Sequence, residues 1–587
     1  MPNKPTQDRP VFLALQGGGA RGLVHIGGLI AANELGLDIK GVSGTSAGSM
    51  VAALVAVGYK GRELVDPEQK THIFNTALKD THIKSPKDIF TPGGWRMLGR
   101  LRWASELPGK IRSCFSPKFS WKKLTLAYSV VLSVIVVSLM LMLMLGGAIG
   151  AYWVVQEHPT FAFCSLFGLG VLSVSVVIWT AWRIQRGLTT VAKVCDFIEE
   201  AMKYKLSQKG LRFQKPITFR DLRQAGCIPL KIVATNAENE SLELFSYEKT
   251  PDVSVAKAVS ASACLPVIFE PCEFDFTRES VYGKEKVSGR FLDGGLVSNL
   301  PAWPFDEERL LHPEIVTVAF NLAPTEQAYG KHWLPAVIGA VVNGTGEIDT
   351  RATGKIIKIA LPTTLKMLDF HVDLDRVIEE VAKPISEVSD KLLTELHDFP
   401  DALDKAARYV QDVMMDVVKS YDGYLFEVNS KPWRVRVALT VQRGDSMRTL
   451  SKVAYAGYEW NDPDRGMTVP LDEHDAGFAW KNQRATFHTR KHLAGEPPLK
   501  NAVFGWERAW THMEWRLCIP IAPATLYGKR ARPCVVIIDS DIPLFYPSAQ
   551  TGAILKDFVT GVGDLVRDYN ETEGIATFVQ GANTWMH

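Results

Sequence analysis

The sequence predicts an α/β fold for its first part and an α+β fold for the remainder. Along the first part, short apolar strands alternate with helical patterns, which is typical of a mainly parallel sheet with helices on both faces. Two long uncharged segments interrupt this alternation. After residue 400 the order changes to a helix, several strands and a closing helix, which indicates a separate domain.

The composition excludes several classes of function. The 587 residues include 66 basic and 64 acidic side chains, a formal net charge of +2, so no overall field attracts nucleic acid and we expect no such partner. The eight cysteines are scattered without the spacing of a metal site, and we expect neither a metal nor an organic cofactor. Residues 1–10 are polar and lead directly into a strand, so no signal peptide is predicted.

A glycine-rich loop, Gly17–Gly22, follows the first strand at 11–15 and precedes a helical pattern. The glycines at 17, 19 and 22 also fit a dinucleotide-binding motif, which needs an acidic residue after the second strand. Asp38 precedes that strand and cannot reach a ribose from there. We therefore interpret the loop as an anion cradle for a tetrahedral intermediate, with dinucleotide binding as the alternative.

The second strand ends in the pentapeptide Gly44-Thr45-Ser46-Ala47-Gly48, which passes directly into an apolar helical pattern. A Gly-x-Ser-x-Gly pattern is typical of a nucleophile elbow, where small residues around a strained serine let strand and helix approach. Ser46 is therefore the candidate nucleophile, and Gly44 and Gly48 supply the room. The N-terminus of the following helix directs free N–H groups to the place where an oxyanion would form.

Two further motifs follow in order, the small-residue segment Ala258–Pro266 and Asp293-Gly294-Gly295 with Asn299 and Pro301 behind it. Together with the glycine loop and the elbow, they resemble a patatin-like phospholipase over residues 10–395. The resemblance implies a Ser46/Asp293 catalytic dyad. It also implies an oxyanion site formed by the backbone N–H groups of Gly17, Gly18, Gly19, Ala20, Arg21 and Ala47.

The chemistry of the dyad is reasonable without the resemblance. A serine hydroxyl is a weak nucleophile and needs a base, which is usually a histidine. No histidine stands near either motif, whereas a partly desolvated carboxylate such as Asp293 can accept the proton of Ser46 directly. A Ser-Asp-His triad that recruits His312 or His332 remains the alternative mechanism.

Two uncharged segments, 124–155 and 160–182, separate the elbow from the later motifs. Each exceeds the roughly 20 residues that a helix needs to cross a bilayer. Basic residues flank the outer ends, while the connecting turn has none, so we expect both termini and the catalytic domain to be cytosolic. The sequence thus predicts an integral membrane protein with two spans, in which residues 116–187 are an insertion between two parts of one domain, 8–115 and 188–398.

The C-terminal segment, 400–587, is predicted to contain the helices Ala402–Lys419 and Ile554–Tyr569 with strands between them. The expected strands are 435–441, 450–455, 503–504, 515–521 and 533–539. The amino-acid pattern of the last two strands resembles that of a GAF domain. This resemblance implies a sensory module with a small-molecule ligand, and the alternative is a structural or dimerisation module in a homo-oligomer. A cyclic-nucleotide signature is absent, so that ligand is not expected.

These motifs predict a membrane-anchored serine acyl hydrolase that acts on a phospholipid or a related lipid ester. Its partners would be the lipid substrate and the bilayer, with regulation by the C-terminal domain as a further hypothesis. The alternative from another class is a membrane-tethered signalling or lipid-binding protein without turnover. An activated serine separates the two, because only the enzyme needs one.

Overall fold

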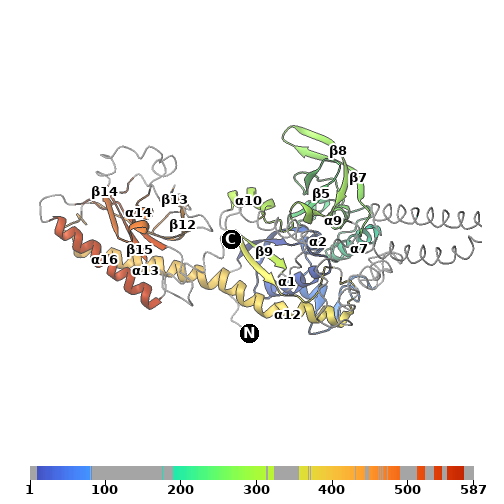
Figure 1. The fold of residues 1–587 in the computed structure, drawn as a ribbon, viewed down its shortest axis with the longest axis horizontal. Coiled ribbons are helices and arrows are strands. Elements are labelled where there is room, and N and C mark those ends of the chain that lie inside the picture. The colour runs from blue at the N-terminus through green and yellow to red at the C-terminus, as the bar shows by residue number, and fades with distance from the viewer. Residues whose placement is uncertain are drawn as a thin grey trace, which may run out of the picture. The chain divides into compact units, whose positions relative to one another are not determined.

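The chain divides into two compact units, one that holds residues 6–353 and 359–389 and one that holds residues 390–587 (Figure 1). Each unit has its own sheet. The computed structural model describes residues 9–79, 81, 175, 189–266, 268–312, 315–322, 349, 356–367, 369–370, 372–429, 431–442, 449–459, 462, 464–465, 467–471, 474–489, 512–521, 534–544 and 551–573.

The first unit is built on an eight-stranded sheet with the order β10-β9-β1-β2-β5-β8-β7, and β6 also pairs with β5. The strands are β1 (Pro10–Leu15), β2 (Asp38–Thr45), β5 (Leu230–Asn236), β6 (Ser241–Phe245), β7 (Cys272–Ser280), β8 (Gly283–Leu292), β9 (Val316–Leu322) and β10 (Ile356–Leu361). Strands β9, β1, β2 and β5 pair in parallel, whereas β6, β7 and β8 pair antiparallel. The predicted α/β class with a parallel core is confirmed, and a hairpin supplies an antiparallel edge.

The parallel strands are buried along most of their length because helices cover them. Helix α2 (Ala47–Ala56) packs on β2, and α9 (Val255–Ser262) packs on β5 and on α7 (Ala192–Gln208). Helix α1 (His25–Glu34) approaches α12 (Leu374–Leu393) closely at a glycine. The shorter elements are η1 (Gly19–Val24), α3 (Gly61–Leu64), β3 (Val65–Asp66), β4 (Thr71–His72), α8 (Phe219–Gln224), η3 (Gly294–Leu296), η4 (Trp303–Phe305) and α10 (Asp306–Leu311).

The prediction of an integral membrane protein with two spans is corrected by the structure. Over the part of the chain that the structure describes, no helix combines the length and the apolar character that crossing a bilayer requires. The segments behind the prediction, 124–155 and 160–182, lie outside the described residues apart from Ser175. The described strands before and after these segments belong to one sheet, because β2 pairs with β5. The boundaries 8–115, 116–187 and 188–398 remain predictions.

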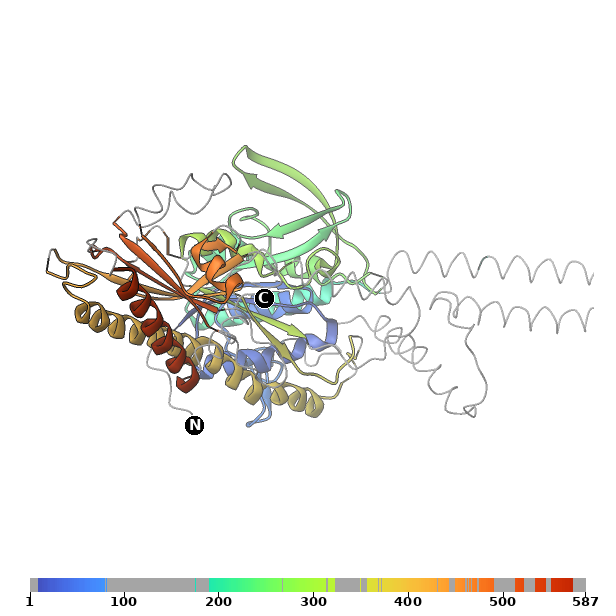
Figure 2. The same ribbon diagram turned by 60° about the vertical axis from the view of Figure 1, so that its left-hand side comes forward.

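The second unit contains a six-stranded antiparallel sheet with the order β13-β12-β11-β16-β15-β14 (Figure 2). Its elements are α13 (Phe399–Ser420), β11 (Val435–Gln442), β12 (Thr449–Ala456), β13 (Thr468–Pro470), α14 (Asp475–Asn482), β14 (Thr486–Thr489), β15 (Trp515–Ile521), β16 (Cys534–Ser540) and α16 (Thr551–Glu573). One face of the sheet packs against α13 and α16, and the other against α14. The predicted helix-sheet-helix order is confirmed, while the strand expected at 503–504 lies outside the described residues.

Helical structure continues from α12 into α13. A π-helical turn, Thr394–Asp398, joins them, and no extended residue intervenes. Pro400 lies in the first turn of α13. The change of pattern near residue 400, which predicts the start of a separate domain, therefore falls within a helix.

Candidate active site

Ser46 occupies a sharp turn between β2 and α2. Its backbone has φ 52° and ψ −125°, a conformation that residues other than glycine rarely adopt. The glycines around it are needed for close approach: a Cβ on Gly44 would lie 2.5 Å from the carbonyl oxygen of Gly48, and one on Gly48 would lie 2.3 Å from that of Leu15. The local geometry is that of a nucleophile elbow.

A second serine holds this turn in place. The backbone N–H of Ser46 donates to Oγ of Ser262 at 2.8 Å, and that hydroxyl donates to the carbonyl of Val233 at 2.6 Å. Ser262 ends α9, the helix of small residues, so the close packing of α9 on β5 brings the hydroxyl within reach. Sequence analysis noted the small residues but not this role.

Asp293 follows β8 and meets Ser46 directly. The hydroxyl of Ser46 donates to Oδ2 of Asp293 at 2.6 Å, and the N–H of Gly295 donates to Oδ1 at 2.7 Å. The two residues are only 7% and 4% exposed. Burial raises the pKa of Asp293 to about 6, although the hydrogen bonds from Ser46 and Gly295 oppose this shift. The pair is therefore a hydroxyl and a carboxyl group that are both nearly buried. The carboxyl group of Asp293 has a pKa near neutral pH.

The glycine loop lies beside this pair, but several of its N–H groups are already used. The N–H of Gly17 donates to the carbonyl of Asn299 at 3.0 Å, and that of Ala20 to the carbonyl of Met367 at 2.9 Å. The N–H of Arg21 donates to the carbonyl of Gly18 at 3.3 Å. Three of the six expected oxyanion donors thus face carbonyl groups.

The other three expected donors are Gly18, Gly19 and Ala47. Within the described part of the chain, the structure gives no acceptor for their N–H groups. Gly19 has φ +58°, which favours glycine, and Ala47 is the first residue of α2, where a helix leaves its N–H groups free. These groups are available to a ligand.

The Arg21 side chain adds a cation to the loop. Its Nε is buried and has no hydrogen-bond partner among the described residues, and burial lowers the pKa of the guanidinium. A Cβ on Gly18 would lie 3.6 Å from this nitrogen. Buried cations are normally paired, so the site is suited to an anion.

The histidines do not replace Asp293 as the partner of Ser46, because the serine proton is directed to the carboxylate. His312 follows α10, and its N–H donates to the carbonyl of Glu308 at 2.8 Å. His332 lies outside the described residues. His25 is buried, and its Nε2 lies 2.8 Å from the carbonyl oxygen of Gln16.

Asp349 supports the site and was missed by sequence analysis. It is buried, and its Oδ2 accepts the N–H of Leu300 at 2.9 Å. Burial raises its pKa to about 6, against hydrogen bonds from Leu300, Ser298 and Asn299. Asp349 thus holds the loop whose Asn299 carbonyl binds Gly17. A lone aspartate far from any motif gives no sequence signal for such a role.

No cluster of residues suited to a metal ion occurs among the described residues. The expected absence of a metal remains a prediction, since it rests on the sequence.

Comparisons with known proteins agree with the first unit. Residues 13–106 and 146–306 match the model of the patatin-like phospholipase family. The chain is 23% identical over 317 residues to an uncharacterized protein, YqhO, of Bacillus subtilis, which covers 53% of this chain and 70% of that protein. It is 26% identical over 120 residues to a probable lipid hydrolase of Invertebrate iridescent virus 6, covering 20% of this chain and 35% of that protein.

Among solved structures, VipD from Legionella pneumophila is similar with a TM-score of 0.26 and 17% identity, over 71% of this chain and 78% of that one. A GAF domain of a sensor histidine kinase from Bacillus halodurans is similar with a TM-score of 0.17 and 16% identity, over 28% of this chain and 96% of that one. TM-scores this low carry no argument about function.

The family match includes the glycine loop, the elbow, the small-residue helix α9 and the Asp293 motif. Over these residues the chain matches the model of the patatin-like phospholipase family, and this match, with the similarity to a probable lipid hydrolase, supports a lipid acyl hydrolase.

Proposed function

We propose that this hydrolase uses a Ser46/Asp293 dyad to cleave ester bonds of phospholipids or related lipids. The observation that carries the proposal is the 2.6 Å hydrogen bond from Oγ of Ser46 to Oδ2 of Asp293 in a nearly dry site. A carboxylate whose pKa is about 6 is mostly ionised at neutral pH and still basic enough to accept a proton.

The reaction follows from this geometry in two steps. Asp293 takes the hydroxyl proton of Ser46 as Oγ attacks the ester carbonyl carbon, and the proton then passes to the departing alcohol. This leaves the acyl group on Ser46. In the second step Asp293 takes a proton from water, the hydroxide attacks the acyl-enzyme, and the fatty acid leaves with the proton returned to Oγ.

We propose that the N–H groups of Gly18, Gly19 and Ala47 bind the oxyanion. Support comes from their lack of acceptors among the described residues, and from the α2 N-terminus, whose dipole favours negative charge. Gly17, Ala20 and Arg21 leave the set as backbone donors, because their N–H groups already donate to carbonyls. The partly buried side chain of Arg21 contributes positive charge beside the loop instead.

The C-terminal unit is proposed to be a GAF-like sensory or dimerisation domain over residues 400–587, following hydrolase parts at 8–115 and 188–398. Its support is an antiparallel sheet covered by two long helices on one face and by a short helix on the other. Such a unit could bind a small molecule or pair with a second copy, which would make the protein a homo-oligomer.

A fluorophosphonate probe tests the proposal, because it labels only an activated serine. We expect the full chain to be labelled at Ser46, and Ser46→Ala to lose the label. Ser49→Ala is the matched control, since its hydroxyl donates to the backbone carbonyl of Ser46 at 2.6 Å and not to the side chain of either dyad residue. An unlabelled Ser46 in a folded protein would favour lipid binding without turnover, whereas labelling that depends on His312 or His332 would favour the triad.

A further inference from the structure

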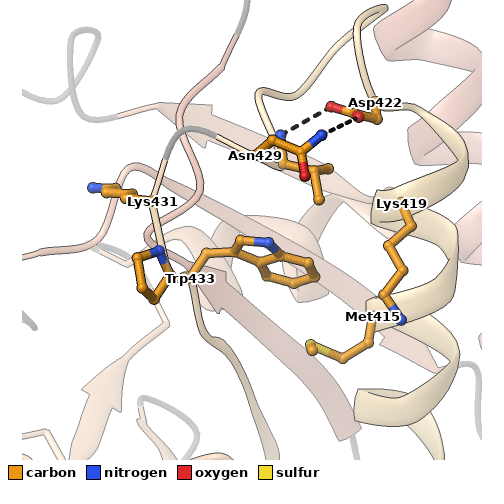
Figure 3. Close-up of a pocket in the computed structure, with 8 residues that line it drawn as sticks. Met415, Lys419, Asp422, Asn429, Lys431 and Trp433 are labelled. Carbon is orange, nitrogen blue, oxygen red and sulfur yellow. Dashed lines mark hydrogen bonds between the residues drawn. The ribbon is translucent and has the colours of Figure 1, made fainter.

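A pocket of about 650 Å³ lies in the C-terminal unit, beside the last turns of α13 (Figure 3). Its volume falls within the range of about 300–1,000 Å³ that is common for small-molecule sites. Met415, Val428 and Trp433 form an apolar wall, and all three are partly buried against the core that α13 shares with the sheet. The pocket therefore has an apolar wall and is widely open to solvent.

The Trp433 indole occupies the middle of this pocket, with Met415 and Lys419 of α13 on one side and Lys431 on the other (Figure 3). Over the part of the chain that the structure describes, no aromatic ring or cation stacks on the indole. A flat apolar ring in this position offers its face to a flexible hydrocarbon chain.

The charge at the rim is mainly positive. Lys419 and Lys431 line the pocket, and the one carboxylate there, Asp422, already accepts hydrogen bonds from the N–H of Val428 at 3.0 Å and from Nδ2 of Asn429 at 3.2 Å. Both donors are neutral, so Asp422 keeps its negative charge, and the residues that line the pocket include two cations and one anion. Lys419 also lies 3.1 Å from Asp416, but both side chains are exposed, and such a pair contributes little.

We propose that this pocket binds a long-chain carboxylate, with its hydrocarbon chain on Trp433 and Met415 and its carboxylate attracted by Lys419 and Lys431, which flank the indole on opposite sides. An apolar wall with two cations at its rim matches an amphipathic anion, and a fatty acid is the smallest lipid of that kind. A lipid acyl hydrolase releases fatty acids, so the product of the first unit is a ligand for the second. The inference rests on the proposed ester hydrolysis only for the source of this ligand.

Photolabelling of the full chain tests the proposal. A palmitic acid analogue with a diazirine in its chain is added below its micelle concentration, irradiated, and located by mass spectrometry of peptides. We expect saturable labelling of peptides that contain Met415 or Trp433, competed by palmitate and about tenfold less well by uncharged methyl palmitate.

Charge reversal supplies the matched variants. The double change Lys419→Glu and Lys431→Glu should weaken labelling about tenfold, since it replaces two attractions by repulsions. Lys405→Glu, an exposed lysine earlier in α13 that does not line the pocket, should leave labelling unchanged. All three lysines are exposed, so circular dichroism should match the parent protein.

Labelling confined to peptides with Ser46 or Asp293, or equal labelling of the double variant and the parent, would overturn the proposal. Fluorophosphonate labelling of the same preparation separates this outcome from a failure of the dyad. A protein that loses the fluorophosphonate reaction but keeps the pocket label contradicts the catalytic proposal alone.

Discussion

Each unit buries an aspartate, and the two carboxyl groups behave in opposite ways. Asp293 is 4% exposed and receives hydrogen bonds from one hydroxyl and one N–H, with no cation against it. Asp539 in β16 is fully buried and accepts hydrogen bonds from Arg436 at 2.9 Å and from Arg516 at 2.7 Å. Burial raises the pKa of Asp293 to about 6, whereas the surrounding cations hold that of Asp539 far below its ordinary range.

The difference shows that burial alone does not make a carboxylate a useful base. A cation beside a buried carboxylate compensates its charge and removes its affinity for a proton, which stabilises the fold but prevents general-base chemistry. Asp539 belongs to a cluster in which Arg436, Arg516 and Lys452 face Asp539 and Asp464. Among the described residues, Asp293 accepts hydrogen bonds from Ser46 and Gly295, and no ion pair to it occurs.

The largest expected effect is the loss of hydrolysis in Asp293→Asn. The amide keeps the shape of the carboxyl but cannot accept the proton of Ser46, so kcat should fall by at least about 10⁴-fold. Ser46→Ala gives the reference for complete loss, about 10⁶-fold. Initial rates on one detergent-solubilised phospholipid measure both. If Asp293→Asn remained active, Asp293 would not be the base, and the functional contrast with Asp539 would be lost. If His312→Ala were inactive in the same assay, a triad would be established.

Asp539→Asn should destabilise the C-terminal unit by about 3–5 kcal/mol, because two buried arginines lose their shared partner. Hydrogen exchange in peptides from β11 and β16 should become faster. Asp557→Asn, an exposed carboxyl on α16, serves as the control and should change little. Fluorophosphonate labelling at Ser46 should persist in both variants. Unchanged exchange in Asp539→Asn would mean that the ionic cluster contributes nothing to stability.

In contrast to Asp539→Asn, the substitution Asp293→Asn should increase the free energy of unfolding at neutral and alkaline pH. The folded pKa of about 6 lies above the unfolded value near 3.9, so ionised Asp293 costs stability above pH 6, and the cost disappears as pH falls toward 4. The cost is on the order of 2–3 kcal/mol. Thermal unfolding should therefore show a higher midpoint for the variant at pH 8 and nearly equal midpoints at pH 4.5. A lower midpoint at pH 8 would contradict the raised pKa.

The smallest effect is the pH dependence of the wild-type enzyme. Only ionised Asp293 can accept the serine proton, so kcat/KM should fall about tenfold for each pH unit below about 6 and level off above it. Rates from pH 4.5 to 8 on a substrate without ionisable groups measure this. A plateau that continues down to pH 4.5 would mean that the base has an ordinary carboxyl pKa.

The catalytic unit was predictable where chemistry leaves a local pattern. The glycines around Ser46 are dictated by close contacts within a few residues, and the family match includes the same motifs. The sequence could not show which backbone N–H groups of the glycine loop are free to bind an oxyanion and which donate to carbonyl groups of the protein. The acceptors for Gly17 and Ala20 are the carbonyls of Asn299 and Met367, which only the folded chain brings near.

The ionic cluster of the second unit was also missed, and the reason is physical. Arg436 and Arg516 are the single charged residues of β11 and β15, and an arginine in a strand is ordinarily exposed to solvent. Here the second face is covered by α14 and by the segment with Asp464, so the arginines are buried with their partners. The short elements β13 and β14 carry too few residues for a periodic signal.

The contacts between the two halves of the catalytic unit have a consequence for the order of synthesis. The Ser46–Asp293 hydrogen bond spans 247 residues, and Ser43 and Thr45 of β2 bond to carbonyls of Pro301 and Ser298. A ribosome makes Ser46 long before Asp293, its partner in the proposed dyad. The nascent chain thus carries Ser46 without this partner until Pro301 has left the exit tunnel, and the proposed site can form only when the later strands join the sheet.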